Sequence, residues 1–341
     1  MTKADYSIFT TIAEMKEEEL LKMLHIFLKK MYGSKRVSAT KSYIIAEGTI
    51  PICLTAHMDT VFSSPPSEIY YDQKKEVMWS PQGLGADDRA GVFAIMKIIQ
   101  EGYRPHVIFT TGEERGGIGA SMLIKVFPKA PFELKYMIEL DRQGISDCVF
   151  YDCANNDFEM YVNKFGYVTA WGTFSDIGIF CPKWGVAGVN LSVGYIREHS
   201  VSEILYWKGL CSTIERVKDM LKDAANVEQF KYIPDPSAYW YYPGIYSFMA
   251  GQGCSPEDDY PSEDDFRTPH KLSCWGCGQL YEHNDLIPVS SRVNPLYDHL
   301  YCYNCISNPD VGWCEKCGDA FEKTADDQKL CPLCAKYGDC T

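Results

Sequence analysis

The chain has 341 residues, 46% of them hydrophobic and 23% charged, a composition typical of globular proteins that excludes fibrous and disordered classes. It contains no run of the roughly 18 to 20 apolar residues that a membrane helix needs, and its acidic, amphipathic first 20 residues lack the layout of a signal peptide. The 33 basic and 46 acidic residues give a formal charge of −13, which argues against broad binding to nucleic-acid phosphates.

The length predicts more than one domain, and the distribution of the 15 cysteines indicates where the second one lies. Eight cysteines form four CxxC pairs after residue 270, which favours zinc ligation over disulfides; with no secretory signal we expect a reducing, cytoplasmic setting. We therefore predict an α/β domain over residues 1–227, an aromatic and then acidic linker over 228–268, and a small zinc-stabilised domain over 269–341.

The N-terminal part alternates between helix-like and strand-like patterns. The apolar spacing over Tyr6–Met31 predicts a helix, with His25 packed in its apolar stripe. Short apolar runs bounded by Gly, Pro or acidic residues predict buried strands at Ile50–Ala56, Val107–Thr111, Tyr136–Leu140 and Val186–Val193. Further helices are expected at Asp88–Gln100, Gly117–Phe127 and Ser202–Ala225. This alternation predicts a three-layer α/β/α domain around a mixed, mostly parallel sheet.

Histidines and carboxylates occur in five short segments at the ends of these elements. The segments are Ala56–Val61 (AHMDTV), Gly85–Gly91 (GADDRAG), Thr111–Gly117 (TGEERGG), Ile138–Asp141 (IELD) and Ser192–Ser200 (SVGYIREHS). Sites in open α/β sheets form outside the carboxyl ends of strands, so the segments are expected to converge on one crevice. A lone His at a strand end is usually structural and an Asp-Asp pair before a helix usually caps it, but five such segments in order indicate a functional site.

The residue types in these segments suit a pair of metal ions. Two metals about 3.5–4 Å apart need a bridging carboxylate, further His and carboxylate ligands, and a free carboxylate that takes a proton from water. In order and wording the segments resemble the co-catalytic dinuclear zinc exopeptidases, the group that includes peptidase T and the bacterial leucyl aminopeptidases, over about residues 50–205.

The resemblance implies a role for each motif residue. The five implied ligands are His57 and Asp141 at the first metal, Glu114 and His199 at the second, and Asp87 as the bridge. Glu113 would be the general base, and Asp59 would orient the imidazole of His57. Zinc is the expected metal, with manganese or cobalt possible on the same ligands. The implied activity is hydrolysis of peptide amide bonds, as an aminopeptidase or dipeptidase acting on small peptides.

The chain departs from many members of this group in one respect. Only 58 positions separate Asp141 from His199, too few for the large lid or dimerisation domain that many of them insert there. We expect a lid to be absent, or to be supplied by the C-terminal part or another subunit. Tyr195 and Arg197 precede His199 and are candidates for stabilising an oxyanion, although packing or surface roles are equally open.

The C-terminal part contains four CxxC knuckles, which fit two structural zinc ions with four thiolates each. The eight cysteines are Cys274, Cys277, Cys302, Cys305, Cys314, Cys317, Cys331 and Cys334. The joint between the second and third knuckles favours consecutive pairing into two zinc-ribbon-like units; a cross-braced, RING-like pairing is the alternative, and His299 could replace one cysteine. His270 and His283 are expected at the surface.

Two functions of different classes follow. The first is a dinuclear zinc amidohydrolase, favoured because all five ligands and Glu113 are present. The alternative is an inactive peptidase-fold scaffold or adaptor whose tail binds a protein partner. Thr268–Thr341 contains six basic and ten acidic residues, a formal −4, so we expect protein contact or self-association of the tail rather than nucleic-acid binding.

Overall fold

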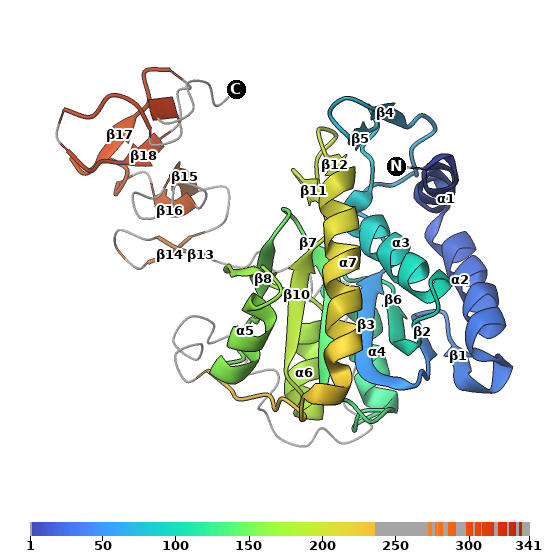
Figure 1. Ribbon diagram of the computed structural model, residues 1–341. Helices are drawn as coiled ribbons and strands as arrows, with labels where there is room; N and C mark the ends of the chain where they lie inside the picture. Colours follow the sequence, from blue (N-terminus) through green and yellow to red (C-terminus); the bar gives the residue numbers. More distant parts are fainter. Residues whose placement is uncertain are drawn as a thin grey trace, which may run out of the picture. The chain divides into compact units, whose positions relative to one another are not determined.

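A computed structural model describes residues 2–235 together with parts of the C-terminal region: 272–274, 277, 279–281, 286–290, 298–302, 304–307, 309–316, 320–325, 327–331 and 334–335. The chain divides into two compact units, Met1–Ala250 and Gly251–Thr341, which are described separately (Figure 1). Most of the predicted linker, residues 236–268, lies outside the described residues, as do Cys317, His270 and His283.

An eight-stranded sheet organises the first unit. Its strands, in spatial order, are β1 (Val37–Ala39), β2 (Tyr43–Ala46), β6 (Pro105–Thr110), β3 (Ile50–His57), β7 (Tyr136–Arg142), β10 (Gly188–Ser192), β8 (Asp147–Val149) and β9 (Val168–Thr169). The four central strands β6, β3, β7 and β10 run parallel, while β1, β2 and β8 pair antiparallel with their inner neighbours. The predicted mixed, mostly parallel sheet is therefore confirmed.

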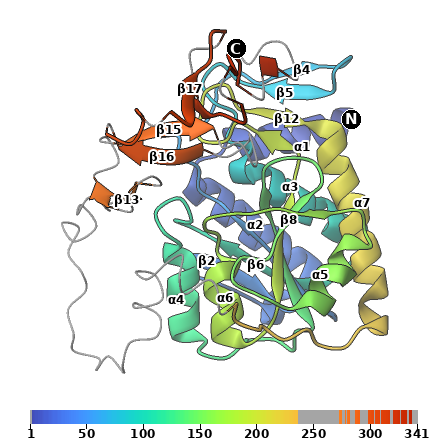
Figure 2. The same ribbon diagram turned by 90° about the vertical axis from the view of Figure 1, so that its left-hand side faces the viewer.

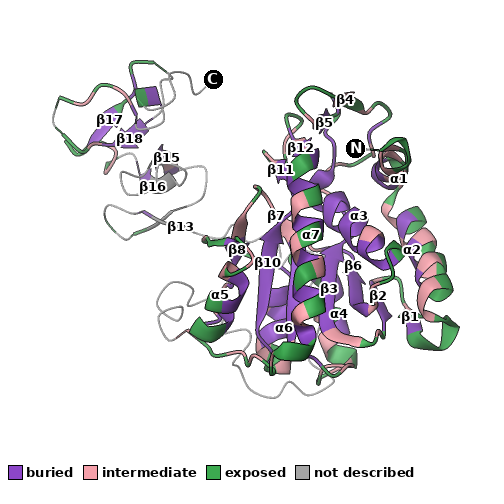
Figure 3. Ribbon diagram, viewed as in Figure 1, coloured by how far each residue is buried: buried purple, intermediate pink, exposed green. Residues whose placement is uncertain are grey.

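Helices cover both faces of this sheet. They are α1 (Lys3–Glu14), α2 (Glu17–Tyr32), α3 (Ala86–Gln100), α4 (Ile118–Val126), α5 (Asn156–Asn163), α6 (Ile177–Trp184) and α7 (Trp207–Asp223). Side chains alternate along β3: Leu54 packs in the core under α3 and α7, and Cys53 in the core under α4 and α6. Figure 2 shows α4 and α6 on one side of the sheet and α7 on the other. The predicted three layers are present, and Figure 3 shows the central strands buried between them.

Two predicted helices differ from the structure. The single helix over Tyr6–Met31 is wrong, because Met15 and Lys16 are extended (ψ 141° and 153°) and separate α1 from α2. A new helix starts there because the Glu19 carboxylate accepts the Lys16 N–H at 3.2 Å, and three glutamates in the first turn favour a helix N-terminus.

The helix predicted over Ser202–Ala225 begins later than expected. Residues Ile204–Tyr206 form β12, and α7 starts only at Trp207. These β-branched, aliphatic and aromatic side chains suit a strand, and β12 pairs with β5 (Val77–Trp79) in a small sheet of order β11-β12-β5-β4, in which β11 is Tyr195–Ile196 and β4 is Tyr70–Asp72. Pairing with β5, more than 120 positions away in the chain, therefore outweighs the helical pattern at the start of Ser202–Ala225.

The region between Asp141 and His199 holds only elements of the main fold. Strands β8, β9, β10 and β11 and helices α5 and α6 occupy it, with no inserted lid domain within this fully described range. The described residues also include no helix that is both long enough and apolar enough to cross a membrane.

The described parts of the second unit form small sheets. A pair β13 (Leu272–Ser273) and β14 (Leu280–Tyr281) precedes a four-stranded sheet of order β16-β15-β18-β17. The bounds of these strands are β15 (Leu286–Ser290), β16 (Asp298–Cys302), β17 (Val311–Trp313) and β18 (Ala320–Glu322). The apolar clusters are small and include cysteines, among them Cys314, Cys331 and Cys334 around Phe321, so the described residues of this unit form little core apart from their sulfur atoms.

Candidate metal centre

The predicted ligands lie at one end of the main sheet, where the parallel strands end. His57 is the last residue of β3, Asp141 lies near the end of β7, and Glu114 follows β6. Asp87 lies in the first turn of α3, and His199 follows β11. The structure therefore brings together all five residues, which span 142 positions of the chain.

Asp87 is at the centre of this cluster. Its Oδ1 atom lies 3.1 Å from Nε2 of His57, and its Oδ2 atom lies 3.2 Å from Nε2 of His199. His57 Nε2 is also 3.3 Å from Oδ1 of Asp141, and His199 Nε2 is 3.0 Å from Oε2 of Glu114. The two oxygens of the Asp87 carboxylate thus contact two different histidines. Each of these histidines also contacts a second carboxylate, Asp141 for His57 and Glu114 for His199.

Asp59 connects His57 to the Glu113–Glu114 segment. Its side chain accepts the backbone N–H groups of Glu113 at 3.2 Å and Glu114 at 3.3 Å. Nδ1 of His57 lies 3.1 Å from the backbone oxygen of Asp59 and 3.4 Å from its Oδ1 atom. These contacts fix the ring so that Nε2 points at Asp87, which is the arrangement expected of a residue that orients a metal-binding imidazole. Oε2 of Glu113 is 4.0 Å from His57 Nε2.

Two backbone features bring these residues together. A Cβ atom at Gly91 in α3 would lie 1.9 Å from the carbonyl oxygen of Leu140, so only glycine allows α3 to approach the end of β7 this closely. His199 has φ of 60°, a left-handed conformation that costs about 1–3 kcal/mol for a residue with a side chain. Such strain clusters at functional sites, and here it accompanies the contact of His199 with Asp87.

Two residues outside the predicted ligand set, Glu203 and Tyr195, contact the cluster. Glu203 is fully buried, and its carboxylate accepts the N–H groups of Ala86 at 2.9 Å and Asp87 at 3.1 Å. Tyr195 donates its hydroxyl to Oδ1 of Asp141 at 3.1 Å, whereas Arg197, the other oxyanion candidate, is exposed. Tyr195 could be suspected from the sequence because it lies close to His199 in the chain, but nothing in the sequence linked Glu203 to Asp87.

Asp88 and Ser175–Asp176 also lie in this region. Asp88 is fully buried, and one of its oxygens lies within 4.8 Å of donor atoms of both His57 and Asp141. It accepts the Gly91 N–H at 2.9 Å, so part of its bonding capacity is used to begin α3. Ser175 donates to the buried Glu139, and Asp176 accepts the Thr110 hydroxyl at 2.5 Å.

The titration properties of the cluster follow from burial and close charges. Burial alone would raise the pKa of Asp87, but its hydrogen bonds with His199 and His57 lower it. Hydrogen bonds with Asp87 and Glu114 raise the pKa of His199 to about 11. Burial, reinforced by Asp141 and opposed by His57, raises the pKa of Glu113 to about 10. Burial likewise raises the pKa of Asp141 to about 7.

This donor set fits a pair of divalent cations. Five carboxylates lie within 4.0 Å of the only two imidazoles of the cluster, those of His57 and His199; they belong to Asp59, Asp87, Glu113, Glu114 and Asp141. Such an excess of buried negative charge is normally balanced by metal ions. The buried Oε1 of Glu114 and Oδ2 of Asp88 have no hydrogen-bond partner among the described residues, which leaves oxygen lone pairs available to a cation. A cavity of about 120 Å³ adjoins the cluster, and His199, with 54% of its side chain exposed, is one of the residues that line it.

The second unit holds a separate group of possible ligands. The sulfur atoms of Cys274, Cys277, Cys302 and Cys305 all lie within 4.8 Å of one another, and those of Cys314, Cys331 and Cys334 form a second such group. The grouping follows the order of the chain, not the cross-braced alternative. The Cys302 N–H donates to the Cys274 sulfur at 3.2 Å, a contact that favours a thiolate. The fourth cysteine of the second group, Cys317, lies outside the described residues.

Comparison with known proteins places the fold. No family model and no curated protein matches the sequence. Among solved structures, the aminopeptidase PepT from Bacillus cereus ATCC 10987 is 17% identical with a TM-score of 0.51, and the match covers 65% of this chain and 98% of that one. A tripeptidase from Staphylococcus aureus subsp. aureus Mu50 is 14% identical with a TM-score of 0.52, covering 65% and 98%.

A TET aminopeptidase from a marine sediment archaeon, Thaumarchaeota archaeon SCGC AB-539-E09, is 14% identical with a TM-score of 0.51, covering 65% of this chain and 97% of that one. Over about two thirds of its length the chain therefore has the fold of these aminopeptidases. Its cysteine-rich C-terminal region fits a zinc-ribbon-like tail.

Proposed function

We propose that the chain is a metal-dependent amidohydrolase that cleaves peptide bonds of small peptides, as an aminopeptidase or dipeptidase. The observation that carries this proposal is the contact of the two Asp87 oxygens with two different histidines, each of which faces a further carboxylate. The aminopeptidase fold supports the same conclusion, because the cluster lies at the carboxyl ends of its parallel strands.

In this proposal the ligand roles follow from the contacts. His57 and Asp141 would hold one ion, His199 and Glu114 the other, and Asp87 both; zinc suits these ligands, and manganese or cobalt could occupy them. Bound there, the ions would lower the pKa of a water molecule and polarise the amide carbonyl.

The protein's own side chains would supply the remaining chemistry. Glu113 would take a proton at its carboxylate from the attacking water and hand it to the leaving amine. Its pKa of about 10 belongs to the cluster without metal, and cations bound beside it would lower that pKa, so that the carboxylate is free to accept the proton. Asp59 acts as a positioning residue for His57, and Tyr195 does the same for Asp141. Arg142, which lines the same cavity, is placed to bind a carbonyl oxygen or a terminal carboxylate of the substrate.

The tail would carry two structural zinc ions. The four thiolates of the first group fit a tetrahedral site, and the three of the second group would complete another if Cys317 supplied the fourth ligand. With so small an apolar core, this unit would depend on zinc to fold. A stable tail of this kind could contact a protein partner or a second copy of the chain.

Metal content together with turnover tests the proposal. The wild type should bind about four metal ions per chain, and the Glu114→Ala, His199→Ala double variant should lose at least one and should lose hydrolysis of an aminoacyl-amide and dipeptide library. A Glu14→Ala, His25→Ala variant makes the same residue changes on α1 and α2 and should resemble wild type. About two metals in every variant, with no turnover by wild type, would instead indicate a scaffold whose tail holds all the metal.

A further inference from the structure

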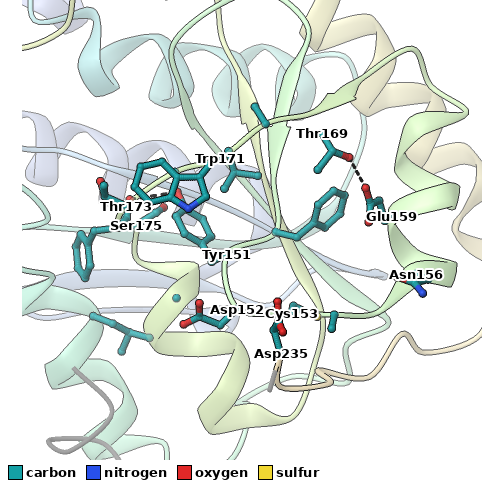
Figure 4. A pocket seen from close by; sticks show the side chains of 18 residues that line it. Tyr151, Asp152, Cys153, Asn156, Glu159, Thr169, Trp171, Thr173, Ser175 and Asp235 are labelled. Atoms are coloured by element: carbon teal, nitrogen blue, oxygen red, sulfur yellow. Dashed lines mark hydrogen bonds between the residues drawn. The ribbon is translucent and has the colours of Figure 1, made fainter. Parts of the chain in front are cut away.

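A second cavity adjoins the cavity of the metal centre. It has a volume of about 320 Å³, at the small end of the roughly 300–1,000 Å³ typical of ligand sites. Its walls come from the segment after β8, the first turns of α5 and α6, and residues 169–175 (Figure 4). Tyr151, Thr173 and Phe174 line both cavities, so a substrate bound at the metal centre lies against the wall of the second cavity.

This shared wall is tied directly to a proposed metal ligand. Tyr151 donates its hydroxyl to the carbonyl oxygen of Phe174 at 3.1 Å and accepts a hydrogen bond from Asn190 at 3.0 Å. Asn190 also pairs with the backbone of Asp141, accepting its N–H at 3.0 Å and donating to its carbonyl at 2.9 Å. The position of the wall relative to the metal centre is therefore set by a short chain of hydrogen bonds between packed elements.

Close packing also shapes the loop that forms the outer wall. A Cβ atom at Gly172 would lie 3.0 Å from the Val149 side chain and 3.4 Å from the Tyr151 ring, so the loop sits tightly over the end of β8. This packing leaves two large apolar side chains turned outward at the cavity: Trp171 is 53% exposed and Phe174 is 39% exposed. Exposed aromatic side chains beside a cavity are typical of ligand contact rather than of core packing.

The cavity has a distinct charge. Its lining includes the carboxylates of Asp152, Glu159 and Asp235, and no lysine, arginine or histidine among the described residues. In Figure 4, Asp152 and Asp235 lie at the lower edge of the cavity and Glu159 at its right, while Trp171 and Tyr151 lie at the upper left. Glu159 is held by Thr169, whose hydroxyl donates to it at 2.6 Å.

We propose that this cavity is the subsite for the side chain of the residue whose carbonyl is attacked, and that it selects a long cationic side chain, lysine or arginine. The proposal rests on the proposed amidohydrolase function, and it names the substrate class. The aliphatic stem of such a side chain would pack on Trp171 and Phe174, and its cationic head would meet ring faces and carboxylates. A carboxylate side chain would be repelled, and a neutral aliphatic one would gain only the apolar contacts.

Kinetics with matched substrates test this selection. For the holoprotein, kcat/KM for lysyl and arginyl amides should exceed that for the norleucyl amide, which has the same stem without the charge, by about tenfold or more. A Glu159→Gln, Asp152→Asn double variant should lose most of that preference, measured as the ratio of kcat/KM for the lysyl amide to kcat/KM for the norleucyl amide. Asp157→Asn is the matched control, because it removes one charge from an exposed residue of the same helix α5 outside the cavity lining.

Three results would overturn the subsite. They are a norleucyl amide cleaved as well as the lysyl amide, an equal loss for all substrates in the double variant, and an Asp157→Asn effect as large as that of the double variant. A calorimetric comparison of L-lysinamide and norleucinamide binding separates this proposal from the peptidase function. If no amide is hydrolysed but lysinamide binds more tightly and the double variant removes the difference, the amidohydrolase function is refuted and the selectivity of the cavity for a cationic side chain is retained. Equal binding of lysinamide and norleucinamide would refute the subsite, whether or not the protein hydrolyses amides.

Discussion

Glu203 provides a sharp test of how Asp87, the proposed bridging ligand, is held. The residue is fully buried, and it accepts two backbone N–H groups at the start of α3, those of Ala86 and Asp87. Burial raises the pKa of Glu203 to about 7, so its carboxylate is charged above that pH. Hydrogen bonds to a charged acceptor contribute about 1.5–3 kcal/mol each, and Glu203→Ala leaves both donors buried without a partner. We therefore expect this variant to lower the free energy of unfolding by about 3–5 kcal/mol.

Glu203→Gln separates the hydrogen bonds from the volume of the side chain. The amide oxygen can still accept one N–H, while the amide nitrogen faces the other donor, so the expected loss is about 1–3 kcal/mol. Because Asp87 shifts when its backbone is released, both variants should also release metal from the first unit at lower chelator concentration than wild type. Urea unfolding followed by far-ultraviolet circular dichroism, with metal analysis, gives both quantities.

A control on a neighbouring helix defines the outcome that would refute this reasoning. Glu215 on α7 has 64% of its side chain exposed and pairs with Lys218, so Glu215→Ala should change stability by no more than about 0.5 kcal/mol. If Glu203→Ala is as mild as this control, or if Glu203→Gln costs as much as Glu203→Ala, the two N–H contacts do not hold the α3 start.

Three other predictions concern chemistry, the tail and pH. Glu113→Gln should lower kcat by about 10²- to 10⁴-fold with unchanged metal content, and a variant that retains full kcat would show that Glu113 is not the base. Cys302→Ser should remove one zinc from the tail and leave the metals of the first unit in place, as native mass spectrometry would show; no change in the metal count would contradict the first cysteine group. Burial lowers the pKa of His106 from its ordinary 6.5 to about 4, and the ring accepts the Gly48 N–H at 3.1 Å, so the folded chain keeps it neutral. As the pH falls, His106 is protonated first in the unfolded chain. Its contribution to the free energy of unfolding is therefore complete above about pH 6.5 and is lost toward pH 4, by at most about 3 kcal/mol. In urea titrations, His106→Gln should make the free energy of unfolding less dependent on pH in this range, and an unchanged pH dependence would refute the assignment.

The five predicted ligands were predictable because their motifs are local and occur in a fixed order. His57, Asp87, Glu114, Asp141 and His199 each lie within a short motif, and the rule that sites form at the carboxyl ends of parallel strands was enough to expect them together.

Other features had no local signal. Glu203 acts on backbone groups 116 and 117 positions away, and no side-chain pattern marks such a partner. Trp171 and Phe174 lie in a loop without helical or strand periodicity, so their place beside the metal centre comes only from the packing of β8, α5 and α6. The break between α1 and α2 did have a signal, the three consecutive glutamates at Glu17–Glu19, but apolar spacing continues across it and masks it.

The two proposed kinds of metal site differ in the length of chain that each must close. His57 and His199 are 142 positions apart, and the strands that carry the first-unit ligands meet only when the central sheet has formed. Cys274 and Cys305 span 31 positions, and Cys314 and Cys334 span 20, so a knuckle can capture an ion while the rest of the chain is unfolded. If both kinds of site bind metal as proposed, the topology sets the loading order. During refolding the tail would take up its ions early and independently of the sheet, and metal binding in the first unit would report completed long-range strand pairing.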